Sequence, residues 1–458
     1  MTQKRQLFGT DGIRGVAGEF PLTAESTFQI GRALGQDLAR NSPRARAVIG
    51  QDTRESSAWI ADRVALGLAS CGVEIASAGV ITTPGVAYLA RSRKFEAGIV
   101  ISASHNPWTD NGIKVFSADG YKLPDSRELA IEKEIFTLVQ SSSMPAGTPT
   151  RPPAPSLPGD AELRRAYIDW LARNVTADLR RFRVLVDCAN GAATAEAPGL
   201  FRTCGVQAVL LHASPDGHNI NENCGALHPE NLASAMAERK GQFDLGVTFD
   251  GDADRALFSD ANGKVINGDA VLLLAARHMQ ALGVLAKNTV VATTMSNMGL
   301  EIALKRSGIG MRRANVGDKY VLEEMQKSGA TLGGEQSGHI IFRDGEATTG
   351  DGLLTALRIL EIMACSGRSL SDLVSDLKVF PQIIQNVRVR EKMPFAQVPQ
   401  VHQAIEAAER ELNGTGRVVV RYSGTEALAR VMVEAEQEAQ MRRIAGVIVE
   451  SIRSTLGA

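Results

Sequence analysis

The sequence predicts an α/β protein with three similar mixed-sheet α/β domains and a C-terminal α+β domain, grouped around a central cleft. Two observations support this fold class. A β-rich run that ends in a polar turn and leads into a helix-like stretch occurs three times along the chain. The last part of the chain has a different order, in which amphipathic helices alternate with strands joined by a short turn. The length of 458 residues also exceeds one ordinary core and suits roughly three or four domains.

The threefold repeat is one of organisation and not of identity. In each unit a first strand ends in a polar turn (QDTRESS, DCANGAAT or TTMSNMG), a second strand follows a glycine, and a third runs into a polar loop. Strands that alternate with helices at this spacing imply βαβ units in a parallel or mixed sheet. The predicted strands are residues 47–50, 73–75 and 97–102 in the first unit, 184–186, 206–211 and 245–249 in the second, and 290–292, 309–313 and 330–333 in the third.

The domain boundaries follow from a linker and a change of pattern. Residues 141–159, SSSMPAGTPTRPPAPSLPG, are too rich in Pro, Ser and Gly to form an ordered element. From about residue 379 we expect a strand at 383–389, a helix at 399–412, two strands within RVVVRYSGTEALARVMVEAE and a helix through residue 454. The predicted domains are residues 1–155, 156–256, 257–375 and 376–458.

The composition excludes several classes of protein. The formal net charge is −1, so no overall field attracts the chain to nucleic acid or to an anionic membrane. The five cysteines include no CxxC pair, which suits reduced thiols in the cytoplasm better than disulfides or a zinc site. No apolar signal region follows the basic N-terminal residues, and no apolar run approaches the ~18–20 residues that cross a bilayer. We expect a cytoplasmic protein that binds its ligand at a local site, with neither a nucleic-acid nor a membrane partner.

A polar loop follows the third predicted strand of each unit: SASHNP, DGDADR or GEQSGH. Ligands of open α/β sheets bind beyond the carboxyl ends of the strands, so we expect these loops to face one cleft. Each loop has an ordinary alternative, namely a hydrogen-bonded turn, a solvated acidic turn or a structural turn around a histidine.

The DGDADR loop predicts a metal site. We expect an extended loop along which Asp250, Asp252 and Asp254 alternate, so that three carboxylates converge on one hard cation. Three carboxylates supply enough negative charge for Mg²⁺ and leave coordination positions of the metal free for a phosphate, so the motif favours Mg²⁺ shared with a phosphate. A calcium EF-hand would need Gly at the sixth loop position and Glu at the twelfth, which here are Arg255 and Ala261. Arg255 is better suited to contact phosphate oxygens.

SASHNP places Ser104 in a tight loop after a strand. The adjacent His105 does not indicate a hydrolase triad, because sequence neighbours seldom align as nucleophile and base and no GxSxG elbow is present. Lys114, in the following NGIKVF, could stabilise phosphate or move a proton. Near the N-terminus, the Gly-rich FGTDGIRG is expected to hold Asp11 and the candidate phosphate ligand Arg14 in a turn.

Two further motifs suit a sugar and a phosphate. GEQSGH combines a carboxylate (Glu335), a hydroxyl (Ser337) and an imidazole (His339) with glycines that allow close approach of a ligand. RYSGTEALAR places hydroxyls and backbone N–H groups between two arginines, a composition that cradles phosphate. Its candidate residues are Arg421, Ser423, Gly424, Thr425 and Arg430. On each segment alone, a structural turn or a β-hairpin with surface arginines remains the alternative.

Taken together and in this order, FGTDGIRG, SASHNP, DGDADR, GEQSGH and RYSGTEALAR resemble the α-D-phosphohexomutase family over residues 8–430. The resemblance implies that Ser104 is a phosphoserine whose phosphate binds Mg²⁺ together with the three aspartates of DGDADR. It also implies sugar contacts from Glu335 and Ser337, and assistance to proton transfer from Lys114 and His339. The residues of RYSGTEALAR would hold the phosphate that is not being transferred.

Within that family, FGTDGIRG, NVGDKYV at residues 315–321 and Gln336 are similar to the branch that interconverts glucosamine 6-phosphate and glucosamine 1-phosphate. The resemblance implies glucosamine 1,6-bisphosphate as intermediate and activator, a role in supplying amino-sugar nucleotides for the cell wall, and a homodimer. The alternative within the family is a phosphomannomutase/phosphoglucomutase. Rival classes are a Mg²⁺ phosphatase and a phosphosugar-binding relative that has lost catalysis.

Three positions depart from the family pattern. Ala427 replaces the usual Pro of the phosphate motif, which is expected to loosen the turn. Ala253 stands where Gly is commoner, at a position that supplies no ligand side chain. Lys319 stands where the branch often has Arg, so we expect a weaker bidentate contact there without loss of function.

Overall fold

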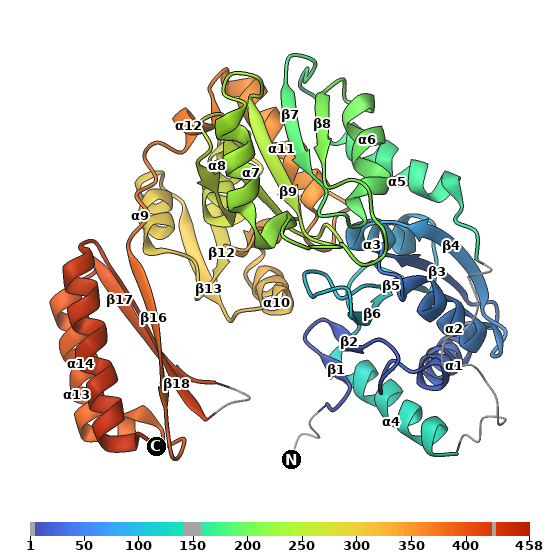
Figure 1. The fold of residues 1–458 in the computed structure, drawn as a ribbon, viewed down its shortest axis with the longest axis horizontal. Helices are drawn as coiled ribbons and strands as arrows, with labels where there is room; N and C mark the ends of the chain where they lie inside the picture. The colour runs from blue at the N-terminus through green and yellow to red at the C-terminus, as the bar shows by residue number, and fades with distance from the viewer. Residues whose placement is uncertain (1–4, 142–156, 344, 424–426) are drawn as a thin grey trace. The chain divides into compact units, whose positions relative to one another are not determined.

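The structure, a computed structural model, describes residues 5–141, 157–343, 345–423 and 427–458. Figure 1 shows the order of the elements along the chain. The chain divides into two compact units, Met1–Met295 with Ile309–Val374, and Ser296–Gly308 with Ser375–Ala458. Most of the predicted linker lies outside the described residues.

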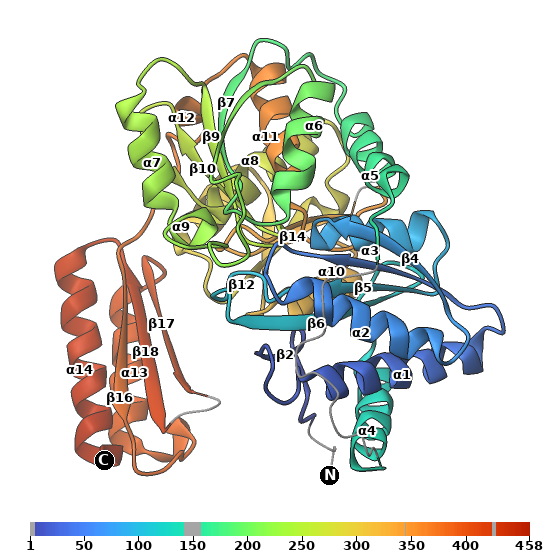
Figure 2. The same cartoon turned by 45° about the vertical axis from the view of Figure 1, so that its right-hand side comes forward.

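The first sheet has six strands in the order β1-β2-β6-β5-β3-β4. The pairs β3–β4 and β3–β5 are parallel, whereas β1, β2 and β6 pair antiparallel. Helices α1 and α2 lie side by side (Figure 2) and share one hydrophobic core with α4 and this sheet. The strands are β1 (Phe8–Gly9), β2 (Gly12–Val16), β3 (Arg46–Gln51), β4 (Glu74–Val80), β5 (Ala97–Ile101) and β6 (Asp110–Ser117); the helices are α1 (Ala24–Asn41), α2 (Ser57–Ala69), α3 (Thr83–Ser92) and α4 (Asp125–Ser141).

The second sheet has the order β11-β10-β9-β7-β8, with β7 parallel to β8 and β9, and β10 antiparallel to β9 and β11. Its strands are β7 (Arg183–Asp187), β8 (Gln207–Leu211), β9 (Leu245–Phe249), β10 (Ala256–Asp260) and β11 (Val265–Ile266). The helices of this segment are α5 (Ala161–Arg173), α6 (Ala193–Thr203), η1 (Gly225–Leu227) and α7 (Pro229–Glu238). The strand β9 is buried along its whole length, which fits its largely apolar sequence LGVTF.

The third sheet has the order β13-β12-β14-β15, with β12 parallel to β13 and β14, and β15 antiparallel to β14. Its strands are β12 (Thr289–Thr293), β13 (Gly310–Ala314), β14 (Leu332–Gly334) and β15 (Ile340–Phe342). The helices of this part of the first unit are α8 (Gly268–Ala281), η2 (Ala286–Asn288), α10 (Asp318–Ser328), α11 (Gly352–Ser366) and α12 (Leu370–Leu373).

The predicted fold class is confirmed, and each predicted α/β strand overlaps an observed strand. The antiparallel strands added to each sheet were not individually predicted. The expectation that Arg14 lies in a turn is wrong, because FGTDGIRG forms a hairpin in which Asp11 is at the turn and Arg14 lies in β2, paired with Gly112 of β6. Pairing with β6 gives the Gly-rich segment the backbone partners that its sequence alone does not indicate.

The second unit contains an antiparallel sheet in the order β16-β18-β17, and the helices α13 (Pro399–Leu412) and α14 (Glu438–Leu456) share a core with these strands. The helix predicted at 399–412 is confirmed as α13. The elements are α9 (Met298–Arg306), β16 (Gln382–Arg388), η3 (Phe395–Gln397), α13 (Pro399–Leu412), β17 (Gly416–Tyr422), β18 (Leu428–Ala435) and α14 (Glu438–Leu456).

A buried carboxylate, Glu434 on β18, joins the sheet of the second unit to the start of α9. The Arg417 guanidinium donates to Glu434 at 2.6 Å, the Gln382 amide at 2.9 Å and the Met298 N–H at 3.2 Å. Glu434 is fully buried, so its charge depends on these donors.

We expect Glu434→Ala to lower the free energy of unfolding of the second unit by about 3–5 kcal/mol, because Arg417 loses its carboxylate partner. Urea unfolding combined with hydrogen exchange of the β18 amides would measure the loss. Glu436→Ala removes an exposed carboxylate paired with Lys378 and should change stability little. Equal effects of the two substitutions would contradict this account.

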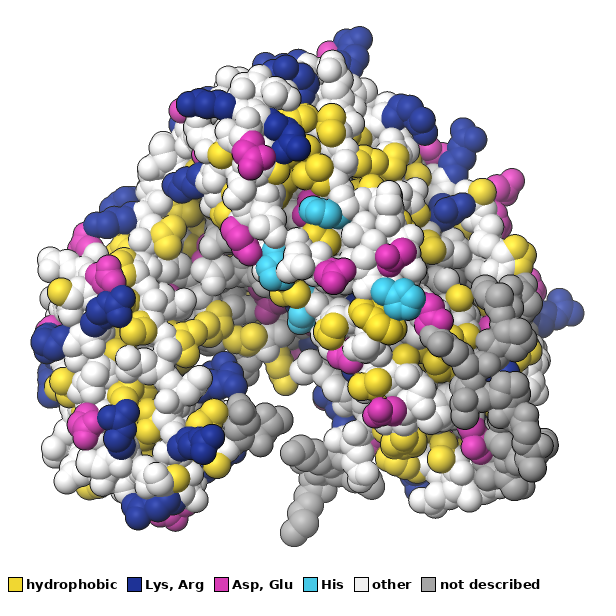
Figure 3. All heavy atoms as spheres, in the orientation of Figure 1, with side chains coloured by type: hydrophobic (Ala, Val, Ile, Leu, Met, Phe, Trp, Pro, Cys, Tyr) yellow, Lys and Arg dark blue, Asp and Glu magenta, His cyan; other side chains and the backbone are white. Residues whose placement is uncertain are grey.

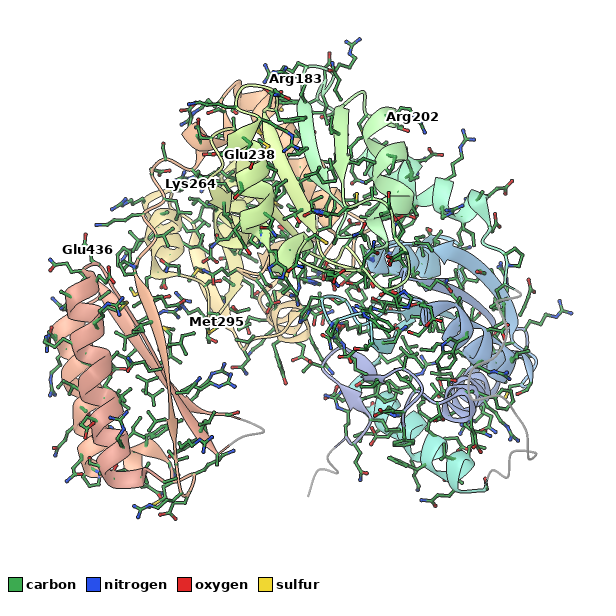
Figure 4. All side chains as sticks on the ribbon, viewed as in Figure 1. Arg183, Arg202, Glu238, Lys264, Met295 and Glu436 are labelled. Atoms are coloured by element: carbon green, nitrogen blue, oxygen red, sulfur yellow. The ribbon has the colours of Figure 1, made fainter. Side chains whose placement is uncertain are left out.

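The surface carries charges of both signs. Figure 3 shows basic and acidic side chains interspersed over one face, in keeping with the net charge of −1. Figure 4 labels three exposed charged residues from the part of the chain that forms the second sheet and its helices: Arg183, Arg202 and Glu238. Among the described helices, none combines the length and the apolar character needed to cross a membrane.

Candidate active site

The loops that follow β5 and β9 meet backbone to backbone. Ser104, which is 1% exposed, donates its hydroxyl to Asp250 Oδ2 at 2.5 Å. A Cβ added to Gly251 would lie 2.5 Å from the Ser104 carbonyl oxygen, so only glycine allows the loops to approach this closely. The contact brings the predicted carrier serine directly to the predicted metal loop.

The three aspartates of DGDADR converge in a tight turn. Asp250, Asp252 and Asp254 are buried and offer oxygen atoms that all lie within 4.8 Å of one another. The expectation of an extended loop is wrong, because the Ala253 N–H donates to the Asp250 carbonyl at 3.0 Å and Ala253 has a φ of 55°. A left-handed residue at this position also explains why Gly would be favoured there.

The electrostatics of this turn favour a bound cation. Burial, together with the neighbouring carboxylates of Asp254 and Asp252, raises the pKa of Asp250 to about 8. Asp252 Oδ1 is buried and accepts no hydrogen bond from any residue in the described ranges. Crowded carboxylates with an unsatisfied oxygen fit a hard divalent cation with oxygen ligands.

Lys114 on β6 is buried among acidic groups. Its Nζ lies 2.8 Å from Asp252 Oδ2, 2.9 Å from Asp11 Oδ2 and 3.6 Å from Asp254 Oδ2. Burial alone would lower the pKa of Lys114, but the carboxylates of Asp11, Asp252 and Asp254 raise it above its usual range. Lys114 is therefore a fixed positive charge near neutral pH.

Arg255 and His339 both lie close to Asp254. Arg255 Nε is 3.8 Å from Asp254 Oδ1, and His339 Nδ1 is 3.6 Å from the same oxygen. Burial opposes a charged imidazole, but Asp254, Asp318 and Glu335 raise the pKa of His339 to about 9. The Gly350 N–H donates to His339 Nε2 at 3.1 Å, which favours the neutral ring with its proton on Nδ1. The surrounding carboxylates therefore favour the protonated ring, whereas the Gly350 contact favours the neutral ring.

His105 beside the serine is a poor cation. Burial and the positive charges of Arg255 and Arg14 lower the pKa of His105 to about 4. Its Nδ1 lies 3.4 Å from Ser104 Oγ. Ser104 donates to Asp250 and, in the part of the chain that the structure describes, no carboxylate accepts a hydrogen bond from His105, so a hydrolase triad is not supported.

The predicted sugar loop borders a cavity of about 400 Å³ in the first unit. Glu335 Oε1 accepts the Gly317 N–H at 3.0 Å, and Ser337 Oγ lies 3.4 Å from Glu335 Oε2. The polar residues lining the cavity are Thr10, Asp11, Arg14, His105, Asp254, Arg255, Asp318, Glu335 and His339. Arg14, Arg255, Glu335 and His339 are thereby brought together, while Ser337 lies beside Glu335 and outside this lining.

The predicted phosphate residues lie in the second unit. Arg421 of β17 and Arg430 of β18 are directly opposite in the strand register. Two like charges at opposite positions destabilise a sheet, and a bound anion would offset their repulsion. Ser423 is buried beside them and accepts from Lys392 Nζ at 2.7 Å through its carbonyl oxygen. Gly424 and Thr425 lie outside the described residues.

Sequence reasoning did not assign a site role to several residues that contact this cluster. The Thr83 hydroxyl donates to Asp252 Oδ2, and its N–H donates to the Asp252 carbonyl at 3.0 Å. Lys122 Nζ lies 2.6 Å from Asp11 Oδ1 and 2.5 Å from Asp318 Oδ2. Thr83 follows the carboxyl end of β4, so the rule that identified the other loops could have identified it.

Comparison with known protein families gives four matches along the chain. They are the phosphoglucomutase/phosphomannomutase alpha/beta/alpha domains I, II and III, at residues 5–141, 165–263 and 267–380, and the C-terminal domain at residues 385–451. A curated relative from Koribacter versatilis (strain Ellin345), named phosphoglucosamine mutase, is 62% identical over 454 residues, which cover 99% of this chain and 98% of the relative.

Solved structures give the same fold. A phosphoglucomutase/phosphomannomutase family protein from Burkholderia thailandensis aligns with a TM-score of 0.79 at 24% identity, covering 98% of this chain and 97% of the other. Aspergillus fumigatus N-acetylphosphoglucosamine mutase, in complex with GlcNAc-6P and magnesium, aligns with a TM-score of 0.60 at 17% identity, covering 98% and 96% of the two chains. The full-length matches show that the chain belongs to the phosphoglucomutase/phosphomannomutase family of phosphohexomutases, on the branch of the phosphoglucosamine mutases.

Proposed function

We propose that the protein interconverts glucosamine 6-phosphate and glucosamine 1-phosphate, with Ser104 as a reusable phosphate carrier. The observation that carries this proposal is the 2.5 Å hydrogen bond from Ser104 Oγ to Asp250, one of three converging buried carboxylates. The 62% identical relative named phosphoglucosamine mutase supports glucosamine as the sugar. A cytoplasmic location suits the unpaired cysteines and a phosphosugar substrate.

Asp250, Asp252 and Asp254, together with the phosphate on Ser104, would hold Mg²⁺. When bound, Mg²⁺ supplies positive charge against the negative charge that develops on the transferring phosphoryl group. Arg255 adds a guanidinium beside Asp250 and Asp254. Lys114 keeps a fixed ammonium beside Asp252.

The transfer has two steps of the same kind. The phosphoserine P–O bond breaks as the free sugar hydroxyl forms its own bond to phosphorus, giving glucosamine 1,6-bisphosphate. The intermediate then returns its other phosphate to Ser104 and leaves as the isomer. We assign sugar contacts to Glu335 and Ser337, a phosphate contact to Arg14, and proton movement to His339 with the help of the Lys114 charge.

The second unit would hold the phosphate that is not reacting. Arg421 and Arg430 are cross-strand neighbours, so one dianion can receive both guanidinium groups. Ser423 adds a hydroxyl, and we assign Gly424 and Thr425 to contacts with the same phosphate by their position in the sequence. The bisphosphate has two phosphates, so while one reacts at Ser104 the other is available to bind this pair of arginines.

Intact-mass measurement tests the carrier role most directly. We expect the purified chain to carry one phosphate on part of the population, and peptide mapping should assign it to Ser104. Treatment with glucosamine 6-phosphate should remove it and give bisphosphate. Free phosphate released in excess of isomerised sugar would instead support the phosphatase alternative.

The alternative substrates are glucose phosphate and mannose phosphate. Both the matching family model and the Burkholderia thailandensis structure have names that include phosphoglucomutase and phosphomannomutase. We expect kcat/KM for glucosamine 6-phosphate to exceed those for glucose 6-phosphate and mannose 6-phosphate by at least about tenfold. Parallel assays with the three phosphates and one enzyme preparation would decide between the branches. A higher value for mannose or glucose phosphate would reject glucosamine.

A further inference from the structure

The Ser104 loop has a backbone conformation that needs external support. Ser104 has a φ of 53°, in the left-handed region that residues with a side chain disfavour. The loop that follows has few backbone partners of its own, since residues 102–109 contain no strand or helix. Other parts of the protein must therefore hold the carbonyl groups of this loop.

Arg54, in the QDTRESS turn after β3, supplies most of that support. Its Nη2 donates at 2.8 Å to the carbonyl oxygens of both Ser104 and Asn106. Its Nη1 donates to the carbonyl oxygens of Pro107 and, at 3.1 Å, Asp110. One guanidinium thus holds three carbonyl groups of the loop and the first carbonyl group of β6.

Asp52 fixes the orientation of that guanidinium. Its Oδ2 accepts Arg54 Nε at 2.8 Å, and both side chains are 0% exposed. The same carboxylate accepts the Ser102 hydroxyl at 2.6 Å, and Ser102 Oγ in turn accepts the Ser104 N–H at 2.9 Å. The carbonyl and the N–H of Ser104 are therefore both tied to the Asp52–Arg54 pair.

Asn221, in the loop between β8 and η1, also holds these carbonyl groups. Its Nδ2 donates to the Ser104 carbonyl at 2.9 Å and to the Asn106 carbonyl at 3.3 Å. Asn221 is buried and has a φ of 58°. The amide therefore links the position of the loop to the segment that carries the metal-binding aspartates.

We infer that Arg54, oriented by Asp52 and assisted by Asn221, is a positioning residue that holds residues 104–110 so that Ser104 Oγ faces Asp250. Its guanidinium donors contact Asp52 and carbonyl groups of the loop, so it acts through the backbone and not on the substrate. The inference rests on the proposed function, because the placement of Oγ matters only if Ser104 carries phosphate.

The test compares Arg54→Lys with Asn221→Gly. Lysine keeps the charge but cannot span four carbonyls, so we expect kcat to fall about 10²-fold with little change in KM. Glycine accepts the φ of Asn221 but lacks the donor, so kcat should fall about tenfold. In both variants the ³¹P NMR resonance of the phosphoserine should shift or broaden. Arg127→Lys is the matched control. The Arg127 guanidinium donates to Asp37 Oδ2 at 2.8 Å, and this pair joins α4 to α1 and not to the Ser104 loop.

Circular dichroism and thermal unfolding would establish that each variant is folded, and Asn221→Gly carries the test if Arg54→Lys does not fold. Folded variants with normal kcat and an unchanged ³¹P resonance would overturn the positioning role. An equal loss in Arg127→Lys would overturn it too. A wild-type enzyme that turns over without any phosphate on Ser104 would reject the proposed function itself, which keeps the two failures distinct.

Discussion

Ser104→Ala should lower kcat for glucosamine 6-phosphate by at least about 10⁴-fold, even when glucosamine 1,6-bisphosphate is supplied. Without Oγ no covalent carrier remains, and the bisphosphate cannot return its second phosphate to the enzyme. Substrate binding should be affected far less, because Arg14, Arg255 and Glu335 still line the cavity. The variant should also have no phosphate by intact mass.

Coupled assay of glucosamine 1-phosphate formation would measure the loss, and equilibrium binding of the substrate would show that the cavity is intact. Ser70→Ala is a suitable control, because the Ser70 hydroxyl donates to the Gly67 carbonyl in its own helix. Near-normal interconversion by Ser104→Ala would remove the carrier role.

Asp252→Asn should lower kcat about 10³-fold and raise the Mg²⁺ concentration needed for half-maximal activity. The substitution keeps the shape of the side chain and removes its charge. Asp252 is also the carboxylate that receives both Lys114 and Thr83, so the variant weakens the contact between the metal loop and the first sheet. Removal of Mg²⁺ from the wild-type enzyme by a chelator should abolish activity, and its return should restore it.

Activity measured across a Mg²⁺ titration, with metal binding followed by calorimetry, would separate weaker binding from slower transfer. Asp119→Asn changes an exposed carboxylate in the turn that follows β6 and should leave both quantities unaltered. Full activity of Asp252→Asn at low Mg²⁺ would eliminate the metal role of this aspartate.

Much of the fold could be predicted because local patterns determine it. The parallel strands β3, β7 and β12 are apolar runs followed by polar turns, and α13 is an amphipathic helix. The added antiparallel strands could not be predicted in the same way. The segment of β1 and β2 is Gly-rich and becomes a hairpin through pairing with β6, about 100 residues further along the chain.

The candidate site likewise contains some residues that local sequence motifs predict and others that depend on distant contacts. Ser104 and the three aspartates stand out in the sequence because they follow strands in short polar motifs. The burial of Lys114 could not be predicted, because an isolated lysine is usually solvated and its carboxylate partner Asp252 lies 138 residues away. The contact of Thr83 with Asp252 spans 169 residues. Contacts of this kind can be identified only from the folded structure, in which the first and second sheets bring distant parts of the chain together.

The close approach at Gly251 has a consequence for mutational tolerance. Any side chain there would strike the Ser104 carbonyl at 2.5 Å, and the obstacle is backbone that cannot rotate away. Two residues later, Ala253 is fully buried and has a φ of 55°, a conformation that glycine adopts more readily than alanine. Within this one motif, Gly251 therefore tolerates no side chain, whereas Ala253 has a backbone conformation that glycine would adopt with less strain.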